Sequence, residues 1–296
     1  MKKIIVILFA LLTLLLSFVG CNSGKLDIYE SVISDTANDG LGVKTETDFW
    51  TGTYFKKDKM PQKSCNVLGN TYTGEYQKSI IDKWNSYTTD TYIDENGFEF
   101  GLRSDTGKVV YLNLMNFDFF ETEPYLQDID KPQEHAIAFS REIASLYVDD
   151  IDKYTQIIEE PITRYKEKNG IQYTITYYVV TYAKKINDCF SSDYISVKVT
   201  SKGNLASIMM GDIGAFDNVT LDFSSSMVDE SISSKISSVY KDYTVKSTEI
   251  DYQRITLTPD GNVCLYSVFK IGIIDSSGVE YKSGIAILTG VGQKNK

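Results

Sequence analysis

The stretch Gly170–Gly211 reads GIQYTITYYVVTYAKKINDCFSSDYISVKVTSKGNLASIMMG and decides how the rest of the chain is interpreted. Apolar residues occupy alternate positions at its start, which is typical of a β-strand with one face in a core. Asn187 and Asp188 then mark a polar turn, and a second strand follows. Lys202-Gly203-Asn204 turns the chain again into a third strand. The stretch therefore predicts antiparallel strands joined by tight turns.

The first of these strands has two different faces. The face predicted to lie in the core carries Ile171, Tyr173, Ile175, Tyr177 and Val179. The other face is polar at first and ends in Tyr178 and Tyr182. Exposed tyrosines on a sheet can contact a peptide, a glycan or a protein, so these two are the candidate binding residues. Burial under a neighbouring unit is the alternative, and it is the usual fate of large aromatic side chains.

Helices with one apolar stripe are predicted before and after this stretch. The spacing of apolar residues indicates helices at residues 131–148 and 228–240, and a third at residues 75–87. Turns such as Asn96-Gly97 separate the strands that follow each helix. The rhythm of one helix and then several strands occurs three times. It predicts an α+β fold of antiparallel sheets, each covered by a helix, in about three units. Their bounds are residues 47–126, 127–212 and 213–296.

The amino-terminal end has the pattern of a secretory signal peptide. A basic start, Met1-Lys2-Lys3, precedes the apolar run Ile4–Val19, which is short for a membrane span. Phe18-Val19-Gly20-Cys21 resembles a bacterial lipobox, which implies that Cys21 carries acyl chains such as palmitate and begins the mature protein. Residues 1–20 would then be removed, and residues 21–46 would be a polar tether. An ordinary cleaved signal or an uncleaved anchor, with Cys21 incidental, is the alternative.

The charge of the chain narrows the class of partner. The full chain has 30 basic and 40 acidic residues and a net charge of −10. Removal of Lys2 and Lys3 with the signal peptide changes the net charge to −12. An acidic domain is repelled by phosphate backbones, so we expect no nucleic-acid partner. Attachment to the membrane would come from the lipid on Cys21, since each buried CH₂ contributes about 0.8 kcal/mol.

No arrangement of residues in the sequence indicates a catalytic or metal site. His135 is the only histidine, and no GxSxG motif accompanies it. Cys65, Cys189 and Cys264 lie far apart with no CxxC spacing, so the sequence predicts no metal or redox site and leaves any disulfide pairing open. No catalytic residue, metal or cofactor is therefore predicted. A pair of carboxylates for glycoside hydrolysis stays open, because the sequence does not place the acids in space.

One segment resembles a known family. It contains a helix with Gln133-Glu134-His135-Ala136-Ile137-Ala138, then a strand, Ile186-Asn187, Asp193–Val199 and Lys202-Gly203-Asn204-Leu205. This order is similar to PepSY-like repeats, which occur in propeptides of thermolysin-type metalloproteases and in bacterial cell-envelope proteins. The match is best over Lys131–Gly211. The resemblance implies protease inhibition or envelope regulation and carries over no catalytic residue.

These observations predict a lipid-anchored protein on the extracytoplasmic face of a bacterial cell membrane. We expect a non-catalytic binding or regulatory module whose partner is an envelope protein, a peptide or a glycan. Two alternatives stay open. One is a protease-inhibitory or chaperone-like module, and the other is a carboxylate-based envelope hydrolase.

Overall fold

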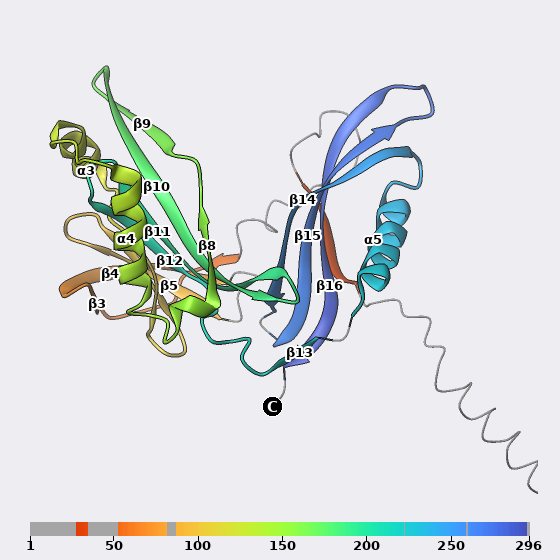
Figure 1. The fold of residues 1–296 in the computed structure, drawn as a ribbon, viewed down its shortest axis with the longest axis horizontal. Helices are drawn as coiled ribbons and strands as arrows, with labels where there is room; N and C mark the ends of the chain where they lie inside the picture. The colour runs from red at the N-terminus through yellow and green to blue at the C-terminus, as the bar shows by residue number, and fades with distance from the viewer. Residues whose placement is uncertain (1–27, 35–52, 82–86, 222, 259, 295–296) are drawn as a thin grey trace, which may run out of the picture.

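The computed structural model describes residues 28–34, 53–81, 87–221, 223–258 and 260–294. Over these residues the chain is mostly β, with sixteen strands that belong to two curved parts joined at one point (Figure 1). We call the described residues of 53–212 the N-terminal lobe, and β1 (Ile28–Ser34) together with the described residues of 213–294 the C-terminal lobe.

The N-terminal lobe is one antiparallel sheet. Its strand order is β2-β4-β5-β6-β7-β12-β11-β10, with β3 beside β4 and with β8 and β9 along the outer edge of β10. The strands are β2 (Thr53–Phe55), β3 (Lys63–Val67), β4 (Asn70–Ile81), β5 (Thr88–Asp94), β6 (Glu99–Arg103), β7 (Val109–Asn113), β8 (Tyr154–Ile158), β9 (Ile162–Lys168), β10 (Ile171–Ile186), β11 (Cys189–Thr200) and β12 (Leu205–Met210). The helical elements of this lobe are α3 (Phe117–Thr122), the 3₁₀ turns η2 (Glu123–Tyr125) and η3 (Ile151–Lys153), and α4 (Pro132–Ala144).

The C-terminal lobe is a smaller antiparallel sheet with helix α5 (Ser225–Val239) on one face. Its order is β14-β15-β16-β1, with β13 also beside β16. The strands are β13 (Val219–Leu221), β14 (Thr244–Leu257), β15 (Asn262–Ile274) and β16 (Glu280–Lys294). A single parallel pair, Ser191 with Ile255, connects this sheet to β11 of the other lobe.

The hairpin β10–β11 belongs to both lobes. Asn187 and Asp188 form its turn, with φ of 47° and 64°. Two positive φ values match the twist of a two-residue hairpin, and Asn and Asp tolerate them best after glycine. Near the turn, Ile186 and Cys189 pack against the core of the C-terminal lobe. Farther along the same strands, Val180 and Ile195 lie in the core under α4. The hairpin predicted from Gly170–Gly211 is thus the connection between the lobes.

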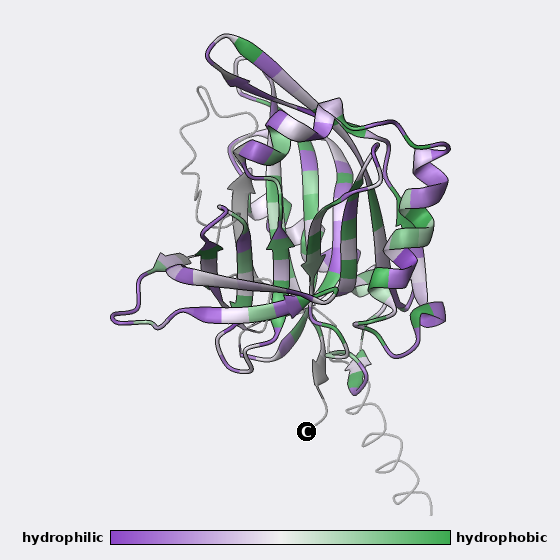
Figure 2. Cartoon of the chain, turned by 90° about the vertical axis from the view of Figure 1, so that its left-hand side faces the viewer, coloured by the Kyte–Doolittle hydropathy of each residue, from purple (hydrophilic) through white to green (hydrophobic). Residues whose placement is uncertain are grey.

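Both faces of β10 are covered. Val180 and Tyr182 pack in the cluster that includes Ala136 and Ile143 of α4. On the opposite face, Tyr177 packs with other β10 residues against Phe120 of α3. Figure 2 shows the apolar residues as bands that alternate with polar residues along the strands. This arrangement explains why a strand with aliphatic and aromatic residues on both faces is stable between β11 on one side and β8 and β9 on the other.

The prediction of an α+β fold with three separate helix-covered sheets is wrong, because the chain is mostly β over the described residues and its strands form one connected sheet. Tyr76 and Ile80, which suggested a helix at residues 75–87, lie in strand β4, and residues 82–86 lie outside the described residues. β7 pairs with β12, so the first two predicted units share one sheet. The helices predicted at residues 131–148 and 228–240 are present as the shorter α4 and as α5.

The amino-terminal predictions are only partly within the described residues. The predicted tether, residues 21–46, contains β1, which pairs with β16 from Ile28–Thr289 to Ser34–Gly284. Cys21 and the signal peptide, residues 1–20, lie outside the described residues. Within the described part of the chain, no helix has the length and apolar character needed to cross a bilayer.

Candidate functional site

The structure places the two predicted binding tyrosines against the core beneath α4. Tyr182 has an exposed fraction of 0%, and Tyr178 is half-buried against the same cluster. The Tyr182 hydroxyl accepts a hydrogen bond from Nε2 of Gln156 at 3.1 Å and lies 3.4 Å from the carbonyl oxygen of Ile137. Burial raises the pKa of Tyr182. Because α4 covers this face of β10, the side chain of Tyr182 is not accessible to a partner. Burial under a neighbouring element, the alternative to a binding role, is therefore the position that Tyr182 has.

The other chemically active residue types are in structural positions. The ring of His135 stacks on Phe139 with a centroid distance of 5.8 Å. Burial raises the pKa of Cys65 to about 11 and that of Cys264 to about 12, so both remain weakly nucleophilic thiols at neutral pH. Among the described residues, no three His, Cys, Asp or Glu side chains gather closely enough to hold a metal ion. Packing and burial therefore describe the positions of His135, Cys65 and Cys264.

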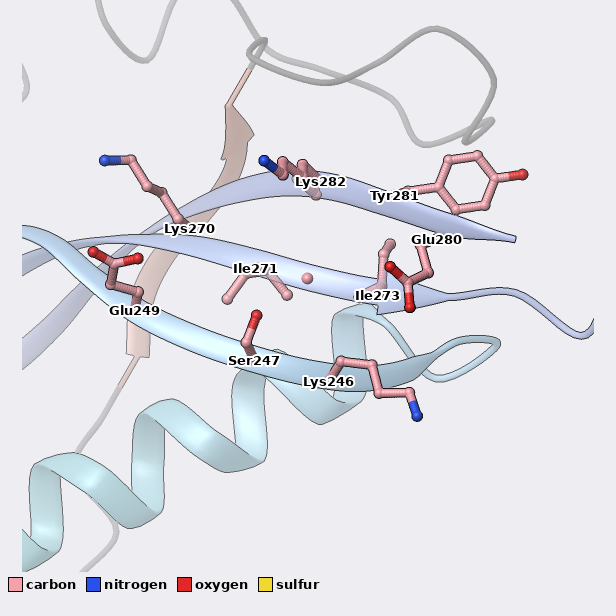
Figure 3. A pocket seen from close by; sticks show the side chains of 11 residues that line it. Lys246, Ser247, Glu249, Lys270, Ile271, Ile273, Glu280, Tyr281 and Lys282 are labelled. Atoms are coloured by element: carbon pink, nitrogen blue, oxygen red, sulfur yellow. The ribbon is translucent and has the colours of Figure 1, made fainter. Parts of the chain in front are cut away.

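One concave surface lies on the sheet of the C-terminal lobe (Figure 3). It is a trough of about 640 Å³ along β14, β15 and β16. Its floor is low at Gly272, where an added Cβ would lie 2.5 Å from Oγ of Ser247. Exposed charged side chains of both signs surround it, and one of them, Lys270, pairs with Asp251 at 2.5 Å. Exposed charges are already solvated, so the trough itself does not favour one class of ligand.

A second concave surface lies in the N-terminal lobe between α3, α4 and the turns of three hairpins, β3–β4, β5–β6 and β11–β12. It has a volume of about 700 Å³, and we call it the Glu123 groove. Its apolar lining includes Leu68, Tyr72, Phe98, Phe119, Phe139 and Leu205. Its polar lining is Asn70, Glu123, Glu142 and Asn204. A mostly apolar concavity with a few polar groups is the usual composition of a ligand site.

Hydrogen bonds near the groove hold its aromatic wall. Asn116 caps α3, because its Oδ1 accepts from the backbone N–H of Phe119 at 2.7 Å. The amide of Asn116 also donates to the carbonyl oxygen of Asn96 in the β5–β6 turn at 2.5 Å. Next to that turn, Phe98 packs edge-on against Tyr72 of β4, with a centroid distance of 6.2 Å. The helix and the hairpins are thus fixed to each other, and the aromatic wall is formed before any ligand enters.

The rim of the groove includes an apolar residue in an unusual backbone conformation. Leu68 has φ of 53° in the β3–β4 turn, a left-handed conformation that costs a residue with a Cβ about 1–2 kcal/mol. Its side chain is 36% exposed and lines the groove. A polar residue that tolerates left-handed φ would make this turn at lower cost. The leucine therefore adds apolar surface at the mouth of the groove.

Glu123 is the polar group that distinguishes this groove. It begins η2, directly after α3, and only 3% of its surface is exposed. One carboxylate oxygen, Oε2, accepts a hydrogen bond from Nδ2 of Asn204 at 3.0 Å. The other oxygen, Oε1, is buried and has no hydrogen-bond partner among the described residues. A buried carboxylate oxygen without a donor is costly, because the hydrogen bonds to water that it loses are not replaced.

The sequence contains little that could reveal Glu123. It precedes Pro124 in the acidic run Glu121-Thr122-Glu123, where a solvated acid is the ordinary expectation. The arrangement in the structure can bind a hydrogen-bond donor or a cation that is attached to an apolar group. Comparisons of the chain with protein-family models, with curated proteins and with solved structures each found no match.

Proposed function

We propose that this chain is a lipid-anchored protein of the extracytoplasmic face of a bacterial membrane, and that it binds a peptide segment in the Glu123 groove without catalysing a reaction. The observation that carries the proposal is the groove itself. Its volume of about 700 Å³ lies within the roughly 300–1,000 Å³ typical of binding sites, and its aromatic lining comes from β4, the β5–β6 turn, α3 and α4. Apolar surface that stays open in a folded protein often marks an interaction site.

A peptide fits this lining better than a glycan does. Sugars need several hydrogen-bonding partners, whereas most of the residues that line the groove are apolar. Aromatic residues such as Phe119 and Phe139 suit apolar side chains or the aliphatic stems of longer ones. The non-catalytic part of the proposal is supported by the raised pKa of Cys65 and of Cys264 and by the packing of His135 on Phe139.

The membrane anchor is tested by Cys21→Ala. We expect the wild type to incorporate labelled palmitate and to fractionate with membranes when it is expressed in a bacterium. The variant should be processed without the label and should appear in the soluble extracytoplasmic fraction. If processed Cys21→Ala still fractionates with membranes, the lipid-anchor part of the proposal is wrong.

The binding function is tested with a library of random heptapeptides selected on the full-length protein. Leu68→Asn places a neutral polar group at the apolar rim, and asparagine tolerates the left-handed conformation there. Val279→Asn is the matched control, since Val279 is an exposed apolar residue of the C-terminal lobe. We expect enriched peptides to bind the wild type and Val279→Asn and to lose affinity for Leu68→Asn. A library that yields no peptide binding above an unrelated control protein would show that the groove is not a peptide site.

A further inference from the structure

We infer that the peptide segment held in the Glu123 groove contributes a lysine side chain, whose ammonium group binds Oε1 of Glu123. This inference rests on the proposed function, because it names the chemistry that the same groove recognises. The starting observation is that Oε1 of Glu123 is buried without a partner among the described residues while Glu123 lines an open groove. A donor that arrives with a ligand supplies the missing hydrogen bond, and a cationic donor also balances the charge.

The position of Glu123 is set by a partner that is itself held firmly. Asn204, which donates to Oε2 of Glu123, ends the turn between β11 and β12. Its backbone N–H donates to Oγ1 of Thr200 at 3.1 Å. In the same turn Gly203 has φ of 88°, and an added Cβ would lie 3.2 Å from Nε2 of His135. The turn is therefore packed against α4. Of the two carboxylate oxygens of Glu123, Oε2 accepts from Asn204, and Oε1 is buried without a partner among the described residues.

A carboxylate with one unpartnered oxygen favours an ammonium group over a guanidinium group. Arginine binds a carboxylate most strongly through two parallel hydrogen bonds, one to each oxygen. In the groove Oε2 of Glu123 already accepts from Asn204, so one of the two parallel hydrogen bonds of an arginine would share that oxygen with the amide. A lysine ammonium is a compact charge that donates to a single oxygen without such a requirement. The geometry thus distinguishes between the two basic residues of a peptide.

The rest of the groove suits the remainder of a lysine side chain. The four methylene groups of lysine pack readily along apolar surface while the charged head reaches a polar partner. Phe119, Phe139 and Leu205 provide that surface. Glu142 is an exposed carboxylate in the lining, and the net charge of the whole chain is −10, so the field at the groove favours a cation.

The experiment uses the peptides selected in the library screen. Each lysine is replaced by norleucine, which keeps a stem of similar length without the charge, and separately by arginine. Affinities for the full-length protein are measured by fluorescence anisotropy. We expect the selected peptides to share a lysine and norleucine to weaken binding about tenfold to hundredfold, the usual effect of a charge-assisted hydrogen bond. Arginine should also bind less tightly than lysine.

The matched protein variants are Glu123→Gln and Glu230→Gln. Glu123→Gln should lower the affinity for the lysine peptide to that of the norleucine peptide and leave the norleucine peptide unchanged. Glu230→Gln removes an exposed carboxylate from α5 of the C-terminal lobe, outside the groove, and should change either affinity by less than about threefold. Thermal unfolding followed by circular dichroism establishes that both variants are folded.

Three outcomes would overturn the inference, and they differ in what they leave standing. Peptides that depend on Leu68 but contain no lysine, or that are indifferent to Glu123→Gln, remove the inference and leave the proposed binding function intact. A library without any binder removes both. If n-hexylamine, an amine on an apolar stem, binds as tightly as the lysine peptides, the occupant is a small amine and the peptide is excluded.

Discussion

The two lobes differ in the polar groups that they bury. Over the described residues, the buried polar side chains of the C-terminal lobe all belong to serine or threonine, such as Thr256, Ser267 and Ser283. The N-terminal lobe buries serine and threonine side chains too, and in addition the carboxyl groups of Asp90, Glu123, Asp193 and Asp212. Burying a carboxylate is far more costly than burying a hydroxyl group, so each of these four sites needs an explanation.

Three of the four carboxylates are explained by partners in the chain. Asp90 pairs with Nζ of Lys57 at 2.7 Å and accepts a hydrogen bond from Oγ of Ser79 at 2.6 Å. Asp193 accepts hydrogen bonds from the hydroxyl of Tyr154 at 2.6 Å and from the backbone N–H of Gly214 at 3.0 Å.

Asp212 accepts a hydrogen bond from Oγ of Ser192 at 3.1 Å. Glu123 differs because, among these four carboxylates, it alone has a buried oxygen, Oε1, without a hydrogen-bond partner among the described residues. The comparison indicates two roles for a buried carboxylate. One with hydrogen-bond partners in the chain stabilises the fold, whereas one with an unpartnered oxygen is a candidate for binding a ligand.

The largest expected effect on stability comes from the hydrophobic core beneath α4. Tyr182→Ala should lower the free energy of unfolding by about 3–5 kcal/mol, because it removes a fully buried aromatic side chain beneath α4. Urea denaturation followed by circular dichroism measures the change. The control is Tyr165→Ala on β9, where the side chain is 63% exposed and the expected change is below about 0.5 kcal/mol. Similar values for the two variants would contradict the placement of Tyr182 in the core.

The same tyrosine shows what the sequence could and could not predict. The strands of Gly170–Gly211 follow from local alternation and from turn residues, and the structure confirms them as β10, β11 and β12. Whether Tyr182 is exposed depends on where α4 packs, and alternation does not contain that information. At Tyr76 and Ile80 the four-residue spacing fits a helix face, but it also fits one face of a strand, so periodicity could not separate the two.

The candidate site could not be predicted from local sequence patterns either. Glu123 and Asn204 are far apart in the sequence, and their hydrogen bond exists only because β12 brings the β11–β12 turn beside η2. The groove collects residues from the β3–β4 turn, the β5–β6 turn, α3 and α4. No window of sequence spans these segments. Long-range strand pairing therefore forms the site, whereas local propensity forms only its parts.

The next effect compares a buried charge with a buried hydroxyl group. Asp90→Ala should cost about 2–3 kcal/mol, because Lys57 and Ser79 lose their acceptor and Lys57 is only 30% exposed. Ser267→Ala in the C-terminal lobe should cost about 1 kcal/mol, since it removes one neutral hydrogen bond from Nε2 of Gln253. Both values come from urea denaturation at neutral pH. If Ser267→Ala is as costly as Asp90→Ala, the contrast between the lobes does not hold.

The pH dependence of the free energy of unfolding should have opposite signs for two of the paired carboxylates, Asp90 and Asp193. Burial raises the pKa of Asp90, but hydrogen bonds from Lys57 and Ser79 outweigh it, and the net pKa lies below its usual value. The stability that Asp90 contributes is then present above its unfolded pKa of about 3.9 and is lost as pH falls through the folded value. For Asp193, burial outweighs the hydrogen bonds from Tyr154 and Gly214, and the pKa is raised. Its contribution is complete below the unfolded pKa of about 3.9 and is lost as pH rises through the folded value.

Urea denaturation from about pH 3 to pH 7 tests these signs. Asp90→Asn should weaken the loss of stability of the wild type at the acidic end of this range. Asp193→Asn should instead remove a decline in stability that begins near pH 4 as pH rises. The readout is the slope of stability against pH, so a constant cost of either substitution does not affect it. Slopes that change in the same direction for both variants would show that the two sites are alike.

The smallest expected effect belongs to the fourth carboxylate. Glu123→Gln removes the charge of a buried group whose Oε1 has no partner, so stability should stay the same or rise by up to about 1 kcal/mol. Asp90→Asn, measured in the same way, should lower stability. If Glu123→Gln lowers the free energy of unfolding as much as Asp90→Asn does, Glu123 has a structural role. The proposed difference between Glu123 and the paired carboxylates would then be wrong.

The pairing of β1 with β16 has a consequence for how the protein is made. Ile33 lies opposite Ile285, so the sheet of the C-terminal lobe joins two strands separated by most of the chain. All strands of the N-terminal lobe lie between β1 and β16 in sequence. During synthesis they can pair as soon as residue 212 has left the ribosome. The C-terminal lobe must wait for β16, which pairs with β1, β13 and β15. A chain truncated before β16 therefore leaves β1 and β15 with unpaired strand edges. Such edges are prone to proteolysis and aggregation, so this lobe is complete only when β16 is present.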